Sequence, residues 1–212
     1  MSAAGRALTP TDALQLRGGW QVCSTPAGEV ADPAALGSVA REWLAAELPA
    51  TAAGALQAAG RWSLDGPPVA FDDSDWWFQT RFDAPWDERA SATTPAQLVF
   101  EGLATLCDVW LNGVQLLSSD NMFVAHEAAA TALRAQDNAL VLRFRSLTRA
   151  LATKRPRPRW RVPMIEQQQL RWFRTTLLGR TPGWSPPAAA VGPWRPIWLL
   201  RPDATRIVDL RL

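Results

Sequence analysis

The segment VWLNGVQLL, residues 109–117, carries the clearest structural signal in this sequence. Two apolar runs, 109–111 and 114–117, flank the dipeptide Asn112-Gly113. Asn and Gly readily adopt the positive φ angles of a two-residue turn, and this pair between apolar runs is a strong hairpin signal. We therefore predict two antiparallel strands joined at Asn112.

Strand-like segments continue on both sides of this hairpin. Residues 75–83 show the alternation well, because Trp76 and Phe78 fall on one face while Trp77 and Gln79 fall on the other. The other segments that we predict as strands are 17–24, 97–102, 106–111, 122–127, 139–146, 193–201 and 207–212. Short strands separated by turn residues predict an all-β chain, folded as an antiparallel jelly-roll β-sandwich of the galactose-binding-domain type.

Helical signals are few. The Ala-rich segments 34–48 and 51–59 favour short helices, and Pro49 separates them. Residues 131–137 have room for a single helical turn at most.

Composition narrows the functional classes. Hydrophobic residues make up 48% of the 212 residues and charged residues 20%, which is typical of a globular chain. The formal net charge of +2 argues against a nucleic-acid protein built on bulk charge. No apolar run is long enough for a membrane helix, and no apolar signal segment follows Met1, so we expect a cytoplasmic chain without membrane contact.

The sequence contains no recognisable pattern of catalytic or metal-binding residues. The acids Asp72, Asp73 and Asp75 precede a strand and are interpreted as solvated turn and capping residues. His126 is the only histidine, and Cys23 and Cys107 are too few for a disulfide framework or a zinc site. We therefore predict no catalytic residue, metal site or cofactor in this chain.

Residues 149–180 form a long basic segment rich in tryptophan and proline. Nine of its residues are Arg or Lys, against the single acid Glu166. It belongs to a longer loop, which separates the strand ending at Ser146 from the one starting near Pro193. Loops of this length inside compact domains are usually functional or disordered, and Trp160, Trp172 and Trp184 within it favour a function. Arginines interleaved with aromatic rings can face a sugar, pack against a neighbouring domain or bind single-stranded nucleic acid.

Five short motifs, taken in order, resemble a known family. They are DWWF (75–78), FEGLAT (100–105), VWLNG (109–113), SDNMF (119–123) and GPWRP (192–196). Together they resemble the N-terminal sugar-binding domain of glycoside hydrolase family 2, and its β-mannosidase branch most. The resemblance covers nearly the whole chain.

The resemblance implies a place within a larger enzyme. In that family the jelly-roll domain precedes immunoglobulin-like domains and a (β/α)8 barrel, and the barrel carries both catalytic glutamates of a retaining mechanism. It implies a jelly-roll domain over residues 1–203, with the start of an immunoglobulin-like domain at 204–212. It also implies that the partners are a β-mannoside-like carbohydrate and the other domains of the same polypeptide.

The resemblance also points to site residues. Family members carry a Gly-Trp-Asp-Trp loop that reaches into the barrel's active site, and Gly183-Trp184-Ser185-Pro186 stands in its place. Ser185 replaces the acid that binds sugar hydroxyls, so the resemblance leaves open which glycoside is cut. Trp184, Ser185 and Asn112 are the expected sugar contacts, although a turn role competes at Asn112. Trp194 and Arg195 are expected to support the loop.

Two other functions stay open on the sequence alone. A free-standing carbohydrate-binding module would use exposed tryptophans as a stacking platform without partner domains. A single-stranded nucleic-acid binder would use the basic residues of 149–180.

Overall fold

The computed structural model describes residues 13–38, 42–86, 95–156 and 159–201. Four strands form the smaller sheet: β1 (Ala13–Gln15), β5 (Gln97–Phe100), β8 (His126–Ala129) and β10 (Ile197–Leu200). Six form the larger sheet: β2 (Trp20–Pro26), β3 (Leu44–Ala46), β4 (Ser74–Phe82), β6 (Cys107–Leu111), β7 (Val114–Ser119) and β9 (Asn138–Phe144). The helices are α1 (Ala52–Ala58) and α2 (Leu147–Leu151), with 3-10 turns η1 (Pro33–Ser38), η2 (Phe71–Asp73) and η4 (Gln168–Trp172).

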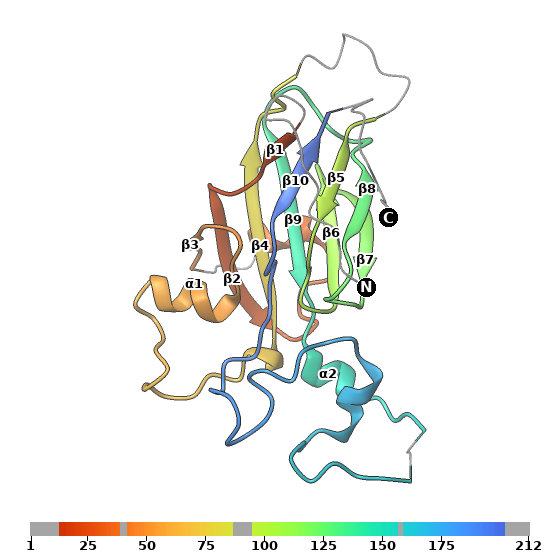
Figure 1. Cartoon of the computed structure of the whole chain (residues 1–212). Helices are drawn as coiled ribbons and strands as arrows, with labels where there is room; N and C mark the ends of the chain where they lie inside the picture. The colour runs from red at the N-terminus through yellow and green to blue at the C-terminus, as the bar shows by residue number, and fades with distance from the viewer. Residues whose placement is uncertain (1–12, 39–41, 87–94, 157–158, 202–212) are drawn as a thin grey trace, which may run out of the picture.

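The two sheets pack face to face as an antiparallel sandwich (Figure 1). The strand order is β1-β10-β5-β8 in the smaller sheet and β3-β2-β4-β9-β6-β7 in the larger one. Every ladder between these strands is antiparallel. The predicted fold class is therefore confirmed, and so is the hairpin: β6 and β7 pair, and Asn112 and Gly113 between them have φ angles of 51° and 81°.

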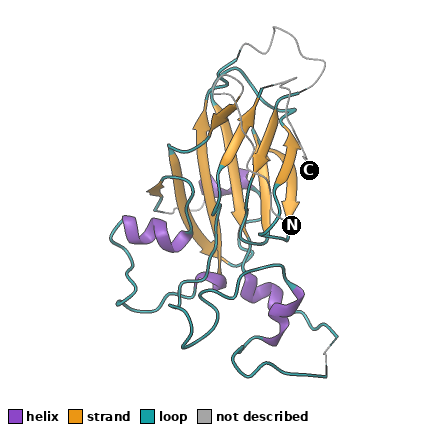
Figure 2. Cartoon of the chain, in the orientation of Figure 1, coloured by secondary structure: helices purple, strands orange, loops and turns teal. Residues whose placement is uncertain are grey.

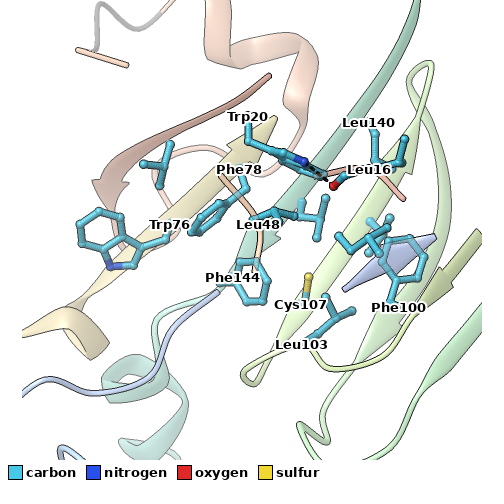
Figure 3. Packing of buried hydrophobic residues seen from close by; sticks show 14 of the residues in the cluster. Leu16, Trp20, Leu48, Trp76, Phe78, Phe100, Leu103, Cys107, Leu140 and Phe144 are labelled. Atoms are coloured by element: carbon cyan, nitrogen blue, oxygen red, sulfur yellow. Dashed lines mark hydrogen bonds between the residues drawn. The ribbon is translucent and has the colours of Figure 1, made fainter. Parts of the chain in front are cut away.

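The main core lies between the inner faces of the two sheets (Figure 3). The rings of Phe78 on β4 and Phe144 on β9 meet edge to face, with centroids 5.5 Å apart. Phe100 on β5 and Leu140 on β9 are fully buried in the same cluster. Trp20 is also buried there, and its indole N–H donates to the Leu16 carbonyl at 2.9 Å. Burying a tryptophan is favourable when its polar N–H is bonded in this way.

A second, smaller core covers the outer face of the larger sheet. Trp77 and Trp110 lie side by side there with centroids 6.0 Å apart, and the Arg143 guanidinium sits 5.6 and 5.7 Å from their centroids. Arg143 also forms an ion pair of 2.6 Å with the buried Asp108. Its Nη1 donates to the carbonyl of Val30, in the segment that covers this face. Both faces of the sheet are therefore buried in this region.

Three sequence predictions need correction. Residues 34–48 do not form a helix: the chain makes η1 and then β3, which pairs with β2, so strand pairing overrides the helix propensity of alanine. The strand predicted from 122 begins only at His126, because the Asn121 side chain accepts the Phe123 N–H and holds a turn there. The strand predicted at 139–146 ends at Phe144, and α2 begins soon after it.

The remaining predictions concern the helix at 51–59, the C-terminal segment and membrane spans. Helix α1 confirms the segment predicted at 51–59, and Thr51 caps it by accepting the Gly54 N–H. The strand predicted at 207–212 and the domain start at 204–212 lie outside the described residues. Among the described residues, no helix is long and apolar enough to span a bilayer.

Candidate functional site

The long segment between β9 and β10 lies at one end of the sandwich, below the sheets in the view of Figure 2. It begins with α2, which Ser146 caps by accepting the Arg149 N–H at 3.1 Å. The Ser146 hydroxyl also donates to the Asp72 carbonyl at 2.8 Å, and its backbone N–H donates to Asp75 at 2.7 Å. These bonds fix the start of the segment against the turn that leads into β4.

A buried ion pair between Arg180 and Asp72 anchors the far part of this segment. Nε and Nη2 of Arg180 donate to the two carboxylate oxygens of Asp72 at 2.6 and 2.7 Å, and the side chains are only 6% and 17% exposed. The same guanidinium donates to the carbonyls of Thr176 at 2.9 Å and Ala190 at 3.3 Å. Arg180 therefore joins both ends of the loop 179–188 to the turn at η2.

The loop 179–188 is closed by its own hydrogen bonds. The Thr181 carbonyl accepts the N–H groups of Trp184 and Ser185, and the Ser185 hydroxyl accepts the Gly179 N–H at 2.8 Å. Gly179 has φ +79°, and a side chain there would collide with the Ala188 carbonyl. The loop is thus a compact turn whose shape depends on Gly179 and Ser185.

Trp184 projects from this closed loop. Its side chain is 74% exposed, whereas Trp20, Trp76 and Trp77 are buried and donate their indole N–H groups to protein oxygens. An aromatic ring held out on a braced loop is suited to stacking on a ligand or on a neighbouring surface.

A cavity of about 640 Å³ lies beside the loop. Its apolar wall includes Phe71, Leu151 and Leu170, and its polar wall includes Ser185 and Arg180. This volume is within the range of pockets that take small molecules. Ser185 lines the cavity, while Trp184 is not among its lining residues.

Asn112 lies away from this loop. Leu111 pairs with Leu140 while Cys107 pairs with Phe144, so the turn at Asn112 is at the end of β9 opposite to α2. The Asn112 amide donates to the Ala132 carbonyl at 2.7 Å and to Asn138 at 3.0 Å, and its oxygen accepts the Ala139 N–H at 2.8 Å. The fold therefore does not bring Asn112 together with Trp184 and Ser185.

Trp194 and Arg195 lie between the loop and β10. The Trp194 indole N–H donates to the Met122 carbonyl at 3.1 Å, and the Arg195 guanidinium stacks 4.4 Å from the centre of its ring. Met122 in turn donates its N–H to the Arg174 carbonyl and accepts the Thr176 N–H on its sulfur. Met122 therefore links Trp194 to residues 174–176, which precede the loop 179–188 in the sequence.

The acids at the start of β4 serve the structure, and two of them correct the sequence interpretation. Asp72 is only 17% exposed and is paired with Arg180. Asp75 is not solvated: it is 2% exposed and accepts the N–H groups of Gly28 and Ser146. Asp73 accepts the Thr148 hydroxyl at 2.6 Å. His126 shares a hydrogen bond of 2.8 Å with Ser119. Across the described ranges, no three His, Cys, Asp or Glu side chains gather where they could hold a metal ion.

The two cysteines are buried and unbridged. Burial raises the pKa of the Cys107 thiol well above its ordinary value, and the nearby negative charge of Asp108 adds to that shift. Cys107 is therefore a core side chain with an unreactive thiol.

Sequence reasoning missed the anchor formed by Arg180 and Asp72. The two residues are 108 positions apart, and neither belongs to a motif. Nothing in the sequence distinguishes Arg180, whose side chain is only 6% exposed, from the other basic residues of 149–180. Only the folded chain separates it from the exposed ones.

Comparison with known proteins agrees with this arrangement. Residues 20–195 match the family model described as "Glycosyl hydrolase 2 galactose-binding domain-like". The β-mannosidase B of Thermothelomyces thermophilus is 30% identical over 138 residues, which cover 60% of this chain and 15% of that protein. The β-mannosidase of Rattus norvegicus is 27% identical over 171 residues, covering 71% of this chain and 19% of that protein.

The fold has a close counterpart among solved structures. The crystal structure of β-D-mannosidase from Dictyoglomus thermophilum superposes with a TM-score of 0.69 at 22% identity, covering 89% of this chain and 22% of that one. This chain thus spans about a fifth of the length of the relatives it matches. Because the family model covers well over half of its residues, the chain belongs to the galactose-binding domain-like family of glycosyl hydrolase 2.

Proposed function

We propose that this chain acts as the N-terminal accessory domain of a family 2 glycosidase that hydrolyses terminal β-mannosides. In this proposal the catalytic carboxylates belong to a barrel domain outside the chain. The loop 179–188 forms one wall of the substrate site, and the domain packs on the other domains of the same polypeptide.

The main observation behind the proposal is the exposure of Trp184 on a loop that is held in place. The ring is 74% exposed, yet the loop beneath it is held by the buried pair of Arg180 and Asp72. A fixed aromatic ring offers a flat apolar face to a sugar at a small cost in conformational entropy. Trp184 therefore stacks on the sugar or shapes the subsite that holds it.

Ser185 has a supporting role in this site. Its hydroxyl accepts the Gly179 N–H, so one of its bonding positions already maintains the loop. The hydroxyl still lines the cavity of about 640 Å³ and can donate to a sugar oxygen. Such a neutral bond is weaker than the charge-assisted bond that a carboxylate would make.

The acids of the chain also support an accessory role. Glycoside hydrolysis by the usual mechanism requires two carboxyl groups flanking the scissile bond. Near the cavity, Asp72 is paired with Arg180, and Asp75 is enclosed by backbone donors. Both carboxylates are therefore engaged within the fold. Glu166 also lines the cavity, but it is a single carboxyl group where the mechanism requires two.

Steady-state kinetics of the full-length gene product test the role of Trp184. With p-nitrophenyl β-mannoside as substrate, we expect Trp184→Ala to lower kcat/KM about tenfold, which corresponds to ~1.4 kcal/mol of lost transition-state binding. The matched control is Phe123→Ala, which removes an exposed aromatic ring from the connection between β7 and β8. Equal kinetics for Trp184→Ala and the parent enzyme would remove Trp184 from the site.

A further inference from the structure

An arm made of residues 152–156 and 159–178 projects beyond the sandwich, to the lower right of Figure 1. The arm is held by Gln168, whose side-chain oxygen accepts the Val162 N–H at 3.0 Å and whose nitrogen donates to the Val162 carbonyl at 2.8 Å. Ile165 and Leu170 pack with Leu147 and Leu151 in a small apolar cluster beneath it. The arm is therefore a folded element with its own core contacts.

A cleft of about 250 Å³ opens on the arm. Its lining residues are Pro156, Trp160, Arg161, Gln168, Gln169, Arg171 and Trp172. Trp160 and Trp172 are 62% and 44% exposed, so the Trp172 ring and the face of the Trp160 ring that Arg171 does not cover are available to a ligand. At roughly 30 Å³ per water, the cleft has room for about eight waters, or about one sugar ring.

This cleft is separate from the cavity beside the loop 179–188. The 3-10 turn η4 divides them: Leu170 lines the larger cavity, whereas Gln168, Arg171 and Trp172 line the cleft. The two share no lining residue. A ligand in the cleft is accordingly held without contact with Ser185 or the loop around it.

The charge around the cleft is positive and partly unpaired. Arg171 is occupied, because it stacks 4.3 Å from the centre of the Trp160 ring and donates to the Gln168 side chain at 2.7 Å. Arg161 is exposed and has no ion pair or side-chain hydrogen bond among the described residues. The only acid in this stretch is Glu166, which lines the larger cavity.

We propose that this cleft is a second saccharide site, which takes a carboxylated sugar such as a uronic acid residue. The sugar ring stacks on the Trp160 and Trp172 rings, and its carboxylate pairs with the Arg161 guanidinium, whose planar fork fits two oxygens. The Gln169 amide supplies both a donor and an acceptor for the hydroxyls. The site goes beyond the proposed function and does not depend on Trp184.

The geometry favours a sugar over a nucleic acid. Single-stranded nucleic acid is held along a groove by many phosphate contacts and a row of stacking rings. Here the cleft fits a single ring, and the guanidinium groups of Arg155 and Arg171 are already stacked on Phe173 and Trp160. Of the two arginines that line the cleft, only Arg161 has a free guanidinium in the described part of the chain, and one carboxylate matches it.

Direct binding to the full-length gene product tests the proposal. Titration calorimetry and tryptophan fluorescence would compare a galacturonic acid trimer, a neutral galactose trimer and an oligothymidylate. We expect the acidic trimer to bind and the neutral trimer to bind at least threefold more weakly. Raising the salt concentration should weaken binding of the acidic trimer only slightly. The slope of log affinity against log salt concentration should be near the value for one ion pair.

Matched variants locate the site. Arg161→Gln is expected to lower the affinity for the acidic trimer about threefold to tenfold, and Trp172→Ala is expected to lower it about tenfold. Arg81→Gln and Phe123→Ala, which remove a guanidinium and an aromatic ring elsewhere on the surface, leave the affinity unchanged. Circular dichroism melts confirm that each variant is folded.

Three results would overturn the proposal. The first is no binding of the acidic trimer, and the second is binding that the two arm variants do not weaken. The third is tighter binding of the oligothymidylate with a steep salt dependence, which would make the arm a nucleic-acid surface. All of these readouts are independent of glycosidase activity, so they are separate from the test of Trp184.

Discussion

At the scale of single residues, one arginine and one aspartate determine where the candidate site lies. Arg180 contacts Asp72 through two nitrogens and also bonds the carbonyls on both sides of the loop 179–188. Bidentate guanidinium–carboxylate pairs fix geometry as well as adding energy. The position of Trp184 therefore depends on the ion pair that holds the loop beneath it.

Replacing Asp72 by Asn tests this dependence. The substitution keeps the shape of the side chain but leaves the Arg180 guanidinium, 6% exposed, without its counter-charge. We expect the free energy of unfolding to fall by about 3 kcal/mol, because removing one partner of a buried ion pair is costly. Urea unfolding followed by fluorescence gives this value.

The control for this measurement is Asp137→Asn. Asp137 pairs with Arg81 at the surface, where both side chains are well exposed. Exposed pairs contribute about 0 to 1 kcal/mol, so the control should change the stability little. Equal losses for Asp72→Asn and Asp137→Asn would show that the buried pair does not anchor the loop.

At the scale of elements, strand β4 has two buried faces. Its inner face carries Phe78 in the main core, and its outer face carries Trp77 against Trp110 and Arg143. Alternation in the sequence correctly placed these side chains on opposite faces. It did not indicate that the outer face is covered, because the covering segment, which includes Val30 and Leu36, comes from a distant part of the chain.

Alanine substitutions along β4 test this double burial. Trp77→Ala should cost about 3 to 5 kcal/mol, as much as Phe78→Ala, because each leaves a large cavity. Gln79→Ala, on the same outer face as Trp77 but only partly buried, should cost less than about 0.5 kcal/mol. A loss at Trp77 no larger than that at Gln79 would contradict a second core on this face. Thermal or urea unfolding of the three variants gives the comparison.

Some of the strands could be predicted from the sequence, and at least one could not. The hairpin at Asn112 was predictable because its turn chemistry is local, and β4 and β9 were predictable because their alternation is strong. The strand β3 was not, since three residues with high helix propensity become a strand only by pairing with β2. Propensity is a weak signal wherever a partner strand is available.

At the scale of the whole molecule, the candidate site is assembled from distant parts of the chain. Its walls come from the turn at η2, from α2 and from the loop 179–188. The motifs placed Trp184 and Ser185 near one another because they are adjacent in sequence. The anchor at Asp72 and the cavity beside it arise only from long-range packing, which no local pattern encodes.

In the proposed function, this chain is one part of a larger glycosidase. The relatives that it matches are several times its length, and the proposed substrate site needs a catalytic partner that contributes two carboxyl groups. The proposal is that this chain contributes one wall of the substrate site and that another domain contributes the catalytic groups.

The intact mass of the native gene product, measured in its own cell by mass spectrometry, tests this claim most directly. The account predicts a polypeptide several times larger than 23.3 kDa, with residues 1–212 within it. A native product of 23.3 kDa would contradict the accessory-domain role and would favour a carbohydrate-binding module that acts alone.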